Sequence, residues 1–442
     1  MKQYYARDAL LPSGWARDVR ISVDAGVISS VEADSDAQGA ERLNGPVLPG
    51  MANVHSHAFQ RAMAGLTDVR AAPHDDFWSW RELMYRFMER LTPEQAQAIA
   101  THLYIEMLQH GYTAVGEFHY VHHPAEMLDR HLAASRDTGI AITLLPSLYR
   151  WSGFDEKPLE PRQRRFASDV RSIIDTVARL RPSQSEDVKV GIAPHSLRAV
   201  DPASLKELIA GVDERTPIHI HAAEQTREVE ECTLALGKRP VEWLLENAAV
   251  DGRWCLVHAT HIQAAEAVAL AASGAVAGLC PSTEADLGDG IFPLLAYRGA
   301  SGRWGIGTDS HVSRDPAAEL RLLEHVQRLV SRRRNINISS ISAAVGTALW
   351  LEAAAGGAQA LGRDMGAIAA GKRADLVVLD GAHPDIAPRN GDAIANAVVF
   401  SGNEKLVRDV MVAGRWIVRA GRHELQEEAA ERYARAVAQL VA

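Results

Sequence analysis

The chain has 442 residues, with 47 Lys and Arg against 56 Asp and Glu, which gives a formal net charge of −9. This length allows two to four ordinary domains, or one large α/β barrel with an accessory module. The acidic balance argues against a nucleic-acid partner, and no sequence window indicates a membrane span. Three widely spaced cysteines and the lack of a signal-peptide pattern favour a cytoplasmic protein without disulfides.

The two ends of the chain share one sequence pattern. Residues 1–47 contain short β-type runs separated by tight turns, and similar runs return within 368–442, for example at 374–380 and 407–412. We therefore expect one small β-sandwich domain built from both ends. The remaining residues, 48–367, form the second expected domain.

The middle of the chain alternates between β-type runs and helical patterns. Eight strand-then-helix units are what a (β/α)8 barrel of the TIM type requires. The long segment 65–92, rich in aromatic residues, is predicted to be a loop over the mouth of the barrel. The eight runs end near His57, Tyr120, Leu148, His195, Glu224, Thr260, Ser282 and Ser310.

His55 and His57 stand two residues apart at the end of the first predicted strand. Side chains alternate along a strand, so both rings are expected to face the barrel interior at its C-terminal rim. Two imidazoles that converge there can share one metal ion. The pair alone is weak evidence, since most histidines are ordinary core or surface residues, and it gains weight from the other strand ends.

The fifth, sixth and eighth strands add further groups of the same kind. The fifth contains His219 and His221 on one face and is followed by Glu224. His221 is favoured as a metal ligand because it lies nearer the mouth, and His219 is expected to pack inside the barrel. The other two strands end in His258 and Asp309. Three imidazoles and one carboxylate suit Zn²⁺ or another divalent ion, with one position left for water.

These motifs resemble the amidohydrolase superfamily over nearly the whole chain. More narrowly, the stretch 55–65 resembles the formimidoylglutamate deiminase family within it. The resemblance implies hydrolysis of N-formimino-L-glutamate to N-formyl-L-glutamate and ammonia, a step of histidine degradation, by a homodimer. The motifs that carry the likeness are Pro49-Gly50, His55-x-His57, His221-x-x-Glu224, His258, Thr308-Asp309 and the segment from Gly371 to Val377.

The resemblance also implies a single ion and a set of roles. Members with two metals usually bridge them through a modified lysine at the end of the fourth strand, whereas here Lys189 stands near the start of that strand. One Zn²⁺, held by His55, His57, His221 and Asp309, is therefore expected. Glu224 is expected to transfer protons, and His258 and Asp309 to orient the attacking oxygen. Gln60 resembles the contact of the family to the formimino group.

The expected substrate carries two carboxylates, which an acidic protein must bind with local cations. Arginine is preferred because its planar fork donates two hydrogen bonds to a carboxylate. The candidates are Arg81 and Arg198, with Tyr120 and His195 as further donors. Five more histidines near the rim have no assigned role: His74, His119, His122, His123 and His311.

Two other readings remain open. A related deaminase acting on an amino-substituted heteroaromatic ring, such as a guanine- or cytosine-like substrate, would share the metal site. It would need fewer cations and more aromatic stacking, for which Trp78, Trp80 and Tyr120 are available. A non-catalytic scaffold barrel would be expected to lose metal ligands, and here the whole set remains. The sequence therefore favours the deiminase.

Overall fold

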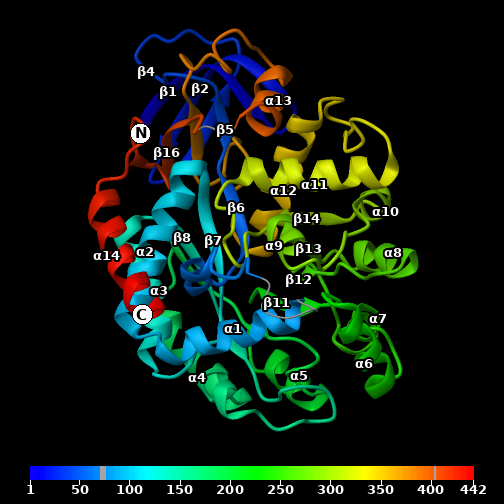
Figure 1. Ribbon diagram of the computed structural model, residues 1–442. Helices are drawn as coiled ribbons and strands as arrows, with labels where there is room; N and C mark the ends of the chain where they lie inside the picture. Colours follow the sequence, from blue (N-terminus) through cyan, green and yellow to red (C-terminus); the bar gives the residue numbers. More distant parts are fainter. Residues whose placement is uncertain (70–75, 403–404) are drawn as a thin grey trace.

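The computed structural model describes residues 1–69, 76–402 and 405–442. Its centre is a barrel of parallel strands, surrounded by helices, with a β domain at one end (Figure 1). None of the helices in these ranges combines the length and the apolar sequence that crossing a bilayer requires.

The barrel forms from two half-sheets. Their strand orders are β10-β8-β7-β6, with β9 on β8, and β11-β12-β13-β14. Parallel bridges between Ser56 and Asp309 and between Ile192 and Ile218 join the two halves into a closed barrel. The expected (β/α)8 fold is confirmed, and the predicted strand ends are close to those observed. The strands are β6 (Met51–Ser56), β7 (Tyr112–His119), β8 (Ala141–Leu148), β9 (Val188–Val190), β10 (Ala193–Pro194), β11 (Ile218–Ala222), β12 (Trp254–His258), β13 (Val276–Leu279) and β14 (Arg303–Ile306).

The outer helices begin where the sequence signals them. Thr92 and Gln95 form a capping box, in which each backbone N–H donates to the side chain of the other residue at 3.0 and 3.2 Å. Asp201 and Asp315 cap two further helices. The helices are α2 (Pro93–His110), α3 (Glu126–Thr138), α4 (Val170–Leu180), α5 (Pro202–Ala210), α6 (Thr226–Leu236), α7 (Pro240–Asn247), α8 (Ala264–Ser273), α9 (Pro281–Asp286), α10 (Leu294–Gly299), α11 (Pro316–Ser331) and α12 (Val345–Ala360).

The segment predicted as a loop over the mouth is in part a helix. After a 3₁₀ turn, η1 (Ala58–Met63), and the undescribed residues 70–75, the chain forms α1 (Phe77–Arg90). Asp76 begins this helix by accepting the backbone N–H groups of Trp78 and Ser79. The segment lies at the mouth of the barrel as predicted, but residues 77–90 form a helix and not a loop. The helix was missed because its Asp-x-x-Ser cap is a short signal inside an aromatic-rich stretch.

Strands from both chain ends form one hydrogen-bonded sheet in the order β17-β16-β15-β5-β1-β2-β3, with β4 on β1. The ends meet where β5 pairs antiparallel with β15, so that Leu48 faces Val377. This arrangement confirms the expected β domain from both termini. Its strands are β1 (Lys2–Leu11), β2 (Gly14–Asp24), β3 (Val27–Glu32), β4 (Glu41–Arg42), β5 (Val47–Pro49), β15 (Leu376–Leu379), β16 (Val407–Val412) and β17 (Arg415–Val418).

Two helices follow within the C-terminal part, α13 (Asp392–Phe400) and α14 (Gln426–Val441). Helix α14 runs beside α2 of the barrel (Figure 1). The side-chain amide of Gln95 donates to that of Gln439 at 3.1 Å. The division into 1–47 plus 368–442 and 48–367 stays a prediction, and the last helix contacts the barrel rather than the β sheet alone.

Candidate active site

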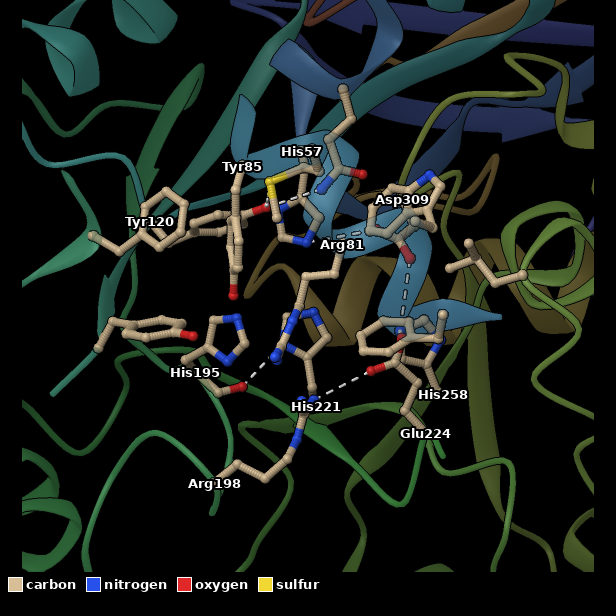
Figure 2. Close-up of a pocket in the computed structure, with 17 residues that line it drawn as sticks. His57, Arg81, Tyr85, Tyr120, His195, Arg198, His221, Glu224, His258 and Asp309 are labelled. Atoms are coloured by element: carbon tan, nitrogen blue, oxygen red, sulfur yellow. Dashed lines mark hydrogen bonds and ion pairs between the residues drawn. The ribbon is translucent and has the colours of Figure 1, made fainter. Parts of the chain in front are cut away.

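One pocket opens at the C-terminal ends of the barrel strands, and side chains of α1, among them Arg81 and Tyr85, line part of it (Figure 2). It is lined by every side chain that the sequence predicts for the site except His55, which lies fully buried beside His57. Such a place is where barrel enzymes carry their catalytic groups, since the strand ends converge there. The predicted residues in the lining are His57, Gln60, Arg81, Tyr120, His195, Arg198, His221, Glu224, His258 and Asp309.

The four predicted metal ligands point at one another. The Nε2 atom of His55 lies 3.1 Å from the Nε2 atoms of both His57 and His221. The Oδ1 atom of Asp309 lies 3.5 Å from His55 Nε2 and 3.4 Å from His57 Nε2. Two nitrogens bound to one tetrahedral Zn²⁺ at about 2.0–2.1 Å would be about 3.3 Å apart. This donor set therefore fits a divalent cation.

Backbone carbonyls fix the rings in this orientation. His57 donates from Nδ1 to the carbonyl of Phe118 at 2.7 Å, and His221 donates from Nδ1 to the carbonyl of His195 at 2.9 Å. These bonds place the ring proton on Nδ1 and leave the Nε2 lone pair facing the centre. Burial also lowers the pKa of His57, and lowers that of His221 well below its usual value. Both rings are thus neutral and able to bind a cation.

The first and eighth strands hold their ligands in register. The backbone N–H of Asp309 donates to the carbonyl of His55 at 3.0 Å, and that of His57 donates to the carbonyl of Asp309 at 3.1 Å. A side chain on Gly307 would place its Cβ 2.8 Å from the Cβ of His55. Glycine at this position allows the close approach of the two strands.

A second group of charged side chains adjoins the ligands. His258 Nε2 lies 3.6 Å from Asp309 Oδ2 and 3.7 Å from Glu224 Oε1, and its Nδ1 lies 3.2 Å from Glu284 Oε1. Burial lowers the pKa of His258, but the surrounding carboxylates outweigh burial and raise it to about 10. Burial raises the pKa of Glu224, which suits a group that accepts and returns a proton. Sequence reasoning missed Glu284, which carries no motif of its own.

Several donors and acceptors in the pocket have no hydrogen-bond partner within the described ranges. Gln60 donates from Nε2 to the hydroxyl of Tyr120 at 2.9 Å, which leaves its buried Oε1 unpaired. The buried Nε–H groups of Arg81 and Arg198 are also without a hydrogen bond. Arg198 is nevertheless ion-paired with two buried carboxylates, since Nη2 lies 3.4 Å from Glu224 Oε2 and Nε lies 3.9 Å from Glu228 Oε2. The pocket thus offers an acceptor and two cationic donors to a ligand.

The remaining histidines are engaged with the protein. His219 is fully buried and hydrogen-bonded to the carbonyl of Ala360 at 2.8 Å, as expected for a packed residue. His119, His122 and His123 bond to backbone carbonyls, whereas His311 bonds to the hydroxyls of Ser56 and Thr308. None of these five lines the pocket. The undecided His74 lies outside the described residues.

Sequence reasoning also missed part of the substrate side of the pocket. Tyr149 and Phe166 line it, although Tyr149, which directly follows the predicted strand end at Leu148, and Phe166 belong to no recognisable motif. Tyr85, which lies in the aromatic-rich segment 65–92, also lines the pocket. The edge-on ring of Tyr149 packs 4.6 Å from the ring of His195, centroid to centroid. These aromatic walls restrict the pocket to a small ligand.

Comparison with known proteins agrees with this site. The Amidohydrolase family matches residues 47–417, and the N-terminal domain of formimidoylglutamate deiminase HutF matches residues 1–45. The chain therefore belongs to the amidohydrolase family. Within it, the chain is similar to the formimidoylglutamate deiminase of Pseudomonas aeruginosa, with 51% identity over 452 residues that cover 100% of both chains.

Two solved structures share the fold. An amidohydrolase from Brucella melitensis is 44% identical, covers 100% of both chains and superposes with a TM-score of 0.94. An adenosine deaminase from Xanthomonas campestris with bound zinc is 21% identical, covers 98% of both chains and superposes with a TM-score of 0.81. At that lower identity the likeness concerns the fold alone.

Proposed function

We propose that this site catalyses the hydrolytic deimination of N-formimino-L-glutamate to N-formyl-L-glutamate and ammonia, as in histidine degradation. The observation that carries the proposal is that a cation-binding centre and two arginines, Arg81 and Arg198, line the same pocket. Two guanidinium groups match the two carboxylates of this substrate. The identity of 51% with the Pseudomonas aeruginosa deiminase supports the same assignment.

We also propose that His55, His57, His221 and Asp309 hold a single Zn²⁺. Imidazole nitrogens with one carboxylate are donors that this ion accepts well. Lys189, which would have to bridge two ions, instead lies in the middle of β9, five residues before the end of β10, with Nζ 3.9 Å from Glu186 Oε1. A bound divalent cation supplies a nucleophile at neutral pH by lowering the pKa of water.

The protein groups then account for the proton transfers. Glu224 takes one proton from the attacking water as the oxygen bonds to the formimino carbon, and passes it to the imino nitrogen. Glu224 then carries the remaining proton of that oxygen to the same nitrogen, which leaves as NH3. His258, charged between its carboxylate neighbours, holds the attacking oxygen together with Asp309. Gln60 accepts a hydrogen bond from the formimino N–H through its unpaired Oε1. The C–N bond breaks and a formyl C=O remains.

A substrate panel tests this function against the heteroaromatic alternative. The purified protein is expected to release ammonia from N-formimino-L-glutamate, and not from guanine or cytosine, because its pocket presents cations to carboxylates. Ammonia release is measured for each of these substrates under identical conditions. Release from guanine or cytosine alone would favour the alternative.

The setting of the enzyme is also a proposal. A cytoplasmic location is supported by three buried cysteines without disulfides, Cys232, Cys255 and Cys280. Assembly as a homodimer rests on the family resemblance. The partner we propose for the pocket is a small dicarboxylate.

A further inference from the structure

The connection between β8 and α4 contributes a buried polar residue to the wall of the pocket. It contains a 3₁₀ turn, η2 (Pro161–Phe166), in which Gln163 is only 1% exposed. Gln163 lies behind two tyrosines that line the pocket, Tyr85 of α1 and Tyr149 next to the end of β8. The side-chain amide donates to the hydroxyl of Tyr85 at 3.1 Å and to that of Tyr149 at 3.2 Å.

The orientation of this amide is fixed by a second contact. The Oε1 atom of Gln163 accepts the backbone N–H of Glu160 at 2.9 Å. A backbone N–H can only donate, so the carbonyl end must face Glu160 and the NH₂ end must face the phenols. Both tyrosine oxygens therefore act as acceptors toward Gln163.

Each phenol still has its own proton to donate. Burial, with a contribution from Tyr85, raises the pKa of Tyr149 well above its usual value, so this hydroxyl stays protonated. The two phenols also hydrogen-bond to each other, so one proton is used within the pair and the other is left for a ligand. Figure 2 shows the Tyr85 hydroxyl directed into the pocket, toward the side of His195.

A donor held in this way calls for an acceptor from the ligand. A buried polar hydrogen left unpaired costs stability, and an anionic acceptor gives the strongest hydrogen bond to it. The Arg81 guanidinium lies 5.5 Å from the centroid of the Tyr85 ring, so positive charge and the phenols share one wall. A carboxylate is the group that satisfies both.

We propose that Tyr85 and Tyr149 form a phenol pair that donates to one carboxylate of the substrate, and that Gln163 is the positioning residue that holds both hydroxyls. This inference rests on the proposed function, because it assigns a binding group to that substrate. It adds a specificity device on the α1 and β8 side of the pocket, separate from the ligands of the cation.

The test compares tyrosine variants on three substrates. Tyr85→Phe, Tyr149→Phe, the double variant and Gln163→Leu are assayed with N-formimino-L-glutamate and with two analogues that each lack one of its carboxylates. The double variant is expected to raise KM for N-formimino-L-glutamate by about 10-fold or more, with kcat changed less than about 3-fold, because the lost bond involves a charged acceptor. On the analogue that lacks the recognised carboxylate, variant and wild type should have equal KM.

Two controls accompany these variants. Arg81→Met should raise KM as the phenol variants do, whereas Tyr112→Phe should not, since Tyr112 is a buried tyrosine at the start of β7, at the other end of the barrel. A double variant with wild-type KM, or a penalty equal on both analogues, would overturn the phenol pair while leaving the proposed function intact. A wild-type protein that releases no ammonia from N-formimino-L-glutamate would defeat the function itself, and the pair with it.

Discussion

Glu224→Gln is expected to lower kcat for ammonia release by about 10²- to 10⁴-fold, the usual contribution of a positioned acid or base. The amide keeps the shape of the side chain but cannot take a proton from water. Glu224 lies 3.7 Å from His258 Nε2 and is not one of the four proposed cation ligands. Metal content and the melting temperature should therefore stay close to those of the wild type, which metal analysis and thermal unfolding will check.

Glu319→Gln provides the matched control for this variant. Glu319 is also fully buried, but its carboxylate accepts from Ser282 rather than facing the pocket. Its replacement should leave kcat nearly unchanged. If Glu224→Gln kept more than about a tenth of the wild-type kcat, the proton transfer would have to be assigned to another group, with the carboxylate of Asp309 as the first candidate.

His221→Asn is expected to abolish both metal binding and ammonia release. In the wild type, His221 Nδ1 makes a hydrogen bond to the His195 carbonyl, and the shorter asparagine amide can keep this bond. The asparagine lacks the Nε2 atom that is proposed to bind the cation. Loss of an outer partner of a ligand already costs about 10- to 100-fold in metal affinity, so loss of a ligand should cost more. Metal per chain and ammonia release, measured on one preparation, give the result.

The neighbouring histidine supplies the control. His219 is on the same face of β11, and glutamine there can still donate to the Ala360 carbonyl. His219→Gln should keep its metal and most of its activity. The opposite pattern, with metal lost from His219→Gln and retained by His221→Asn, would mean that the wrong histidine of this strand has been assigned.

The predictable part of this site follows from strand geometry. His55, His57, His221 and His258 can be placed from the sequence because side chains alternate along a strand and parallel strands end at one rim. The same reasoning distinguishes His219, which lies one layer deeper in the barrel, from His221, the proposed metal ligand. Local rules of this kind need no knowledge of distant contacts.

The parts that were missed depend on connections between strands. Glu284 reaches His258 from α9, the short helix after β13, and Gln163 reaches Tyr85 from the long connection between β8 and α4. Neither Glu284 nor Gln163 belongs to a periodic pattern or a motif that predicts a role in the pocket. Only the folded path of the connecting segments brings these two residues near the pocket. Helix α1 was missed for a related reason, because its cap is a single short signal.

Backbone conformation marks the same centre independently. His258 and Asp309 have φ of 68° and 47°, in the left-handed region that non-glycine residues seldom adopt. Such residues cost about 1–3 kcal/mol each and persist where the surrounding structure holds them, often at functional sites. Here they turn two strand ends so that an imidazole and a carboxylate face the pocket.

The most direct measurement follows ammonia release from N-formimino-L-glutamate against metal bound per chain in a single preparation, before chelation, after chelation and during return of Zn²⁺. We expect no turnover without metal, recovery in proportion to the zinc restored, and a plateau at one ion per chain. Full turnover by the metal-free chain would contradict the central claim, and a plateau at two ions would contradict the single-ion site.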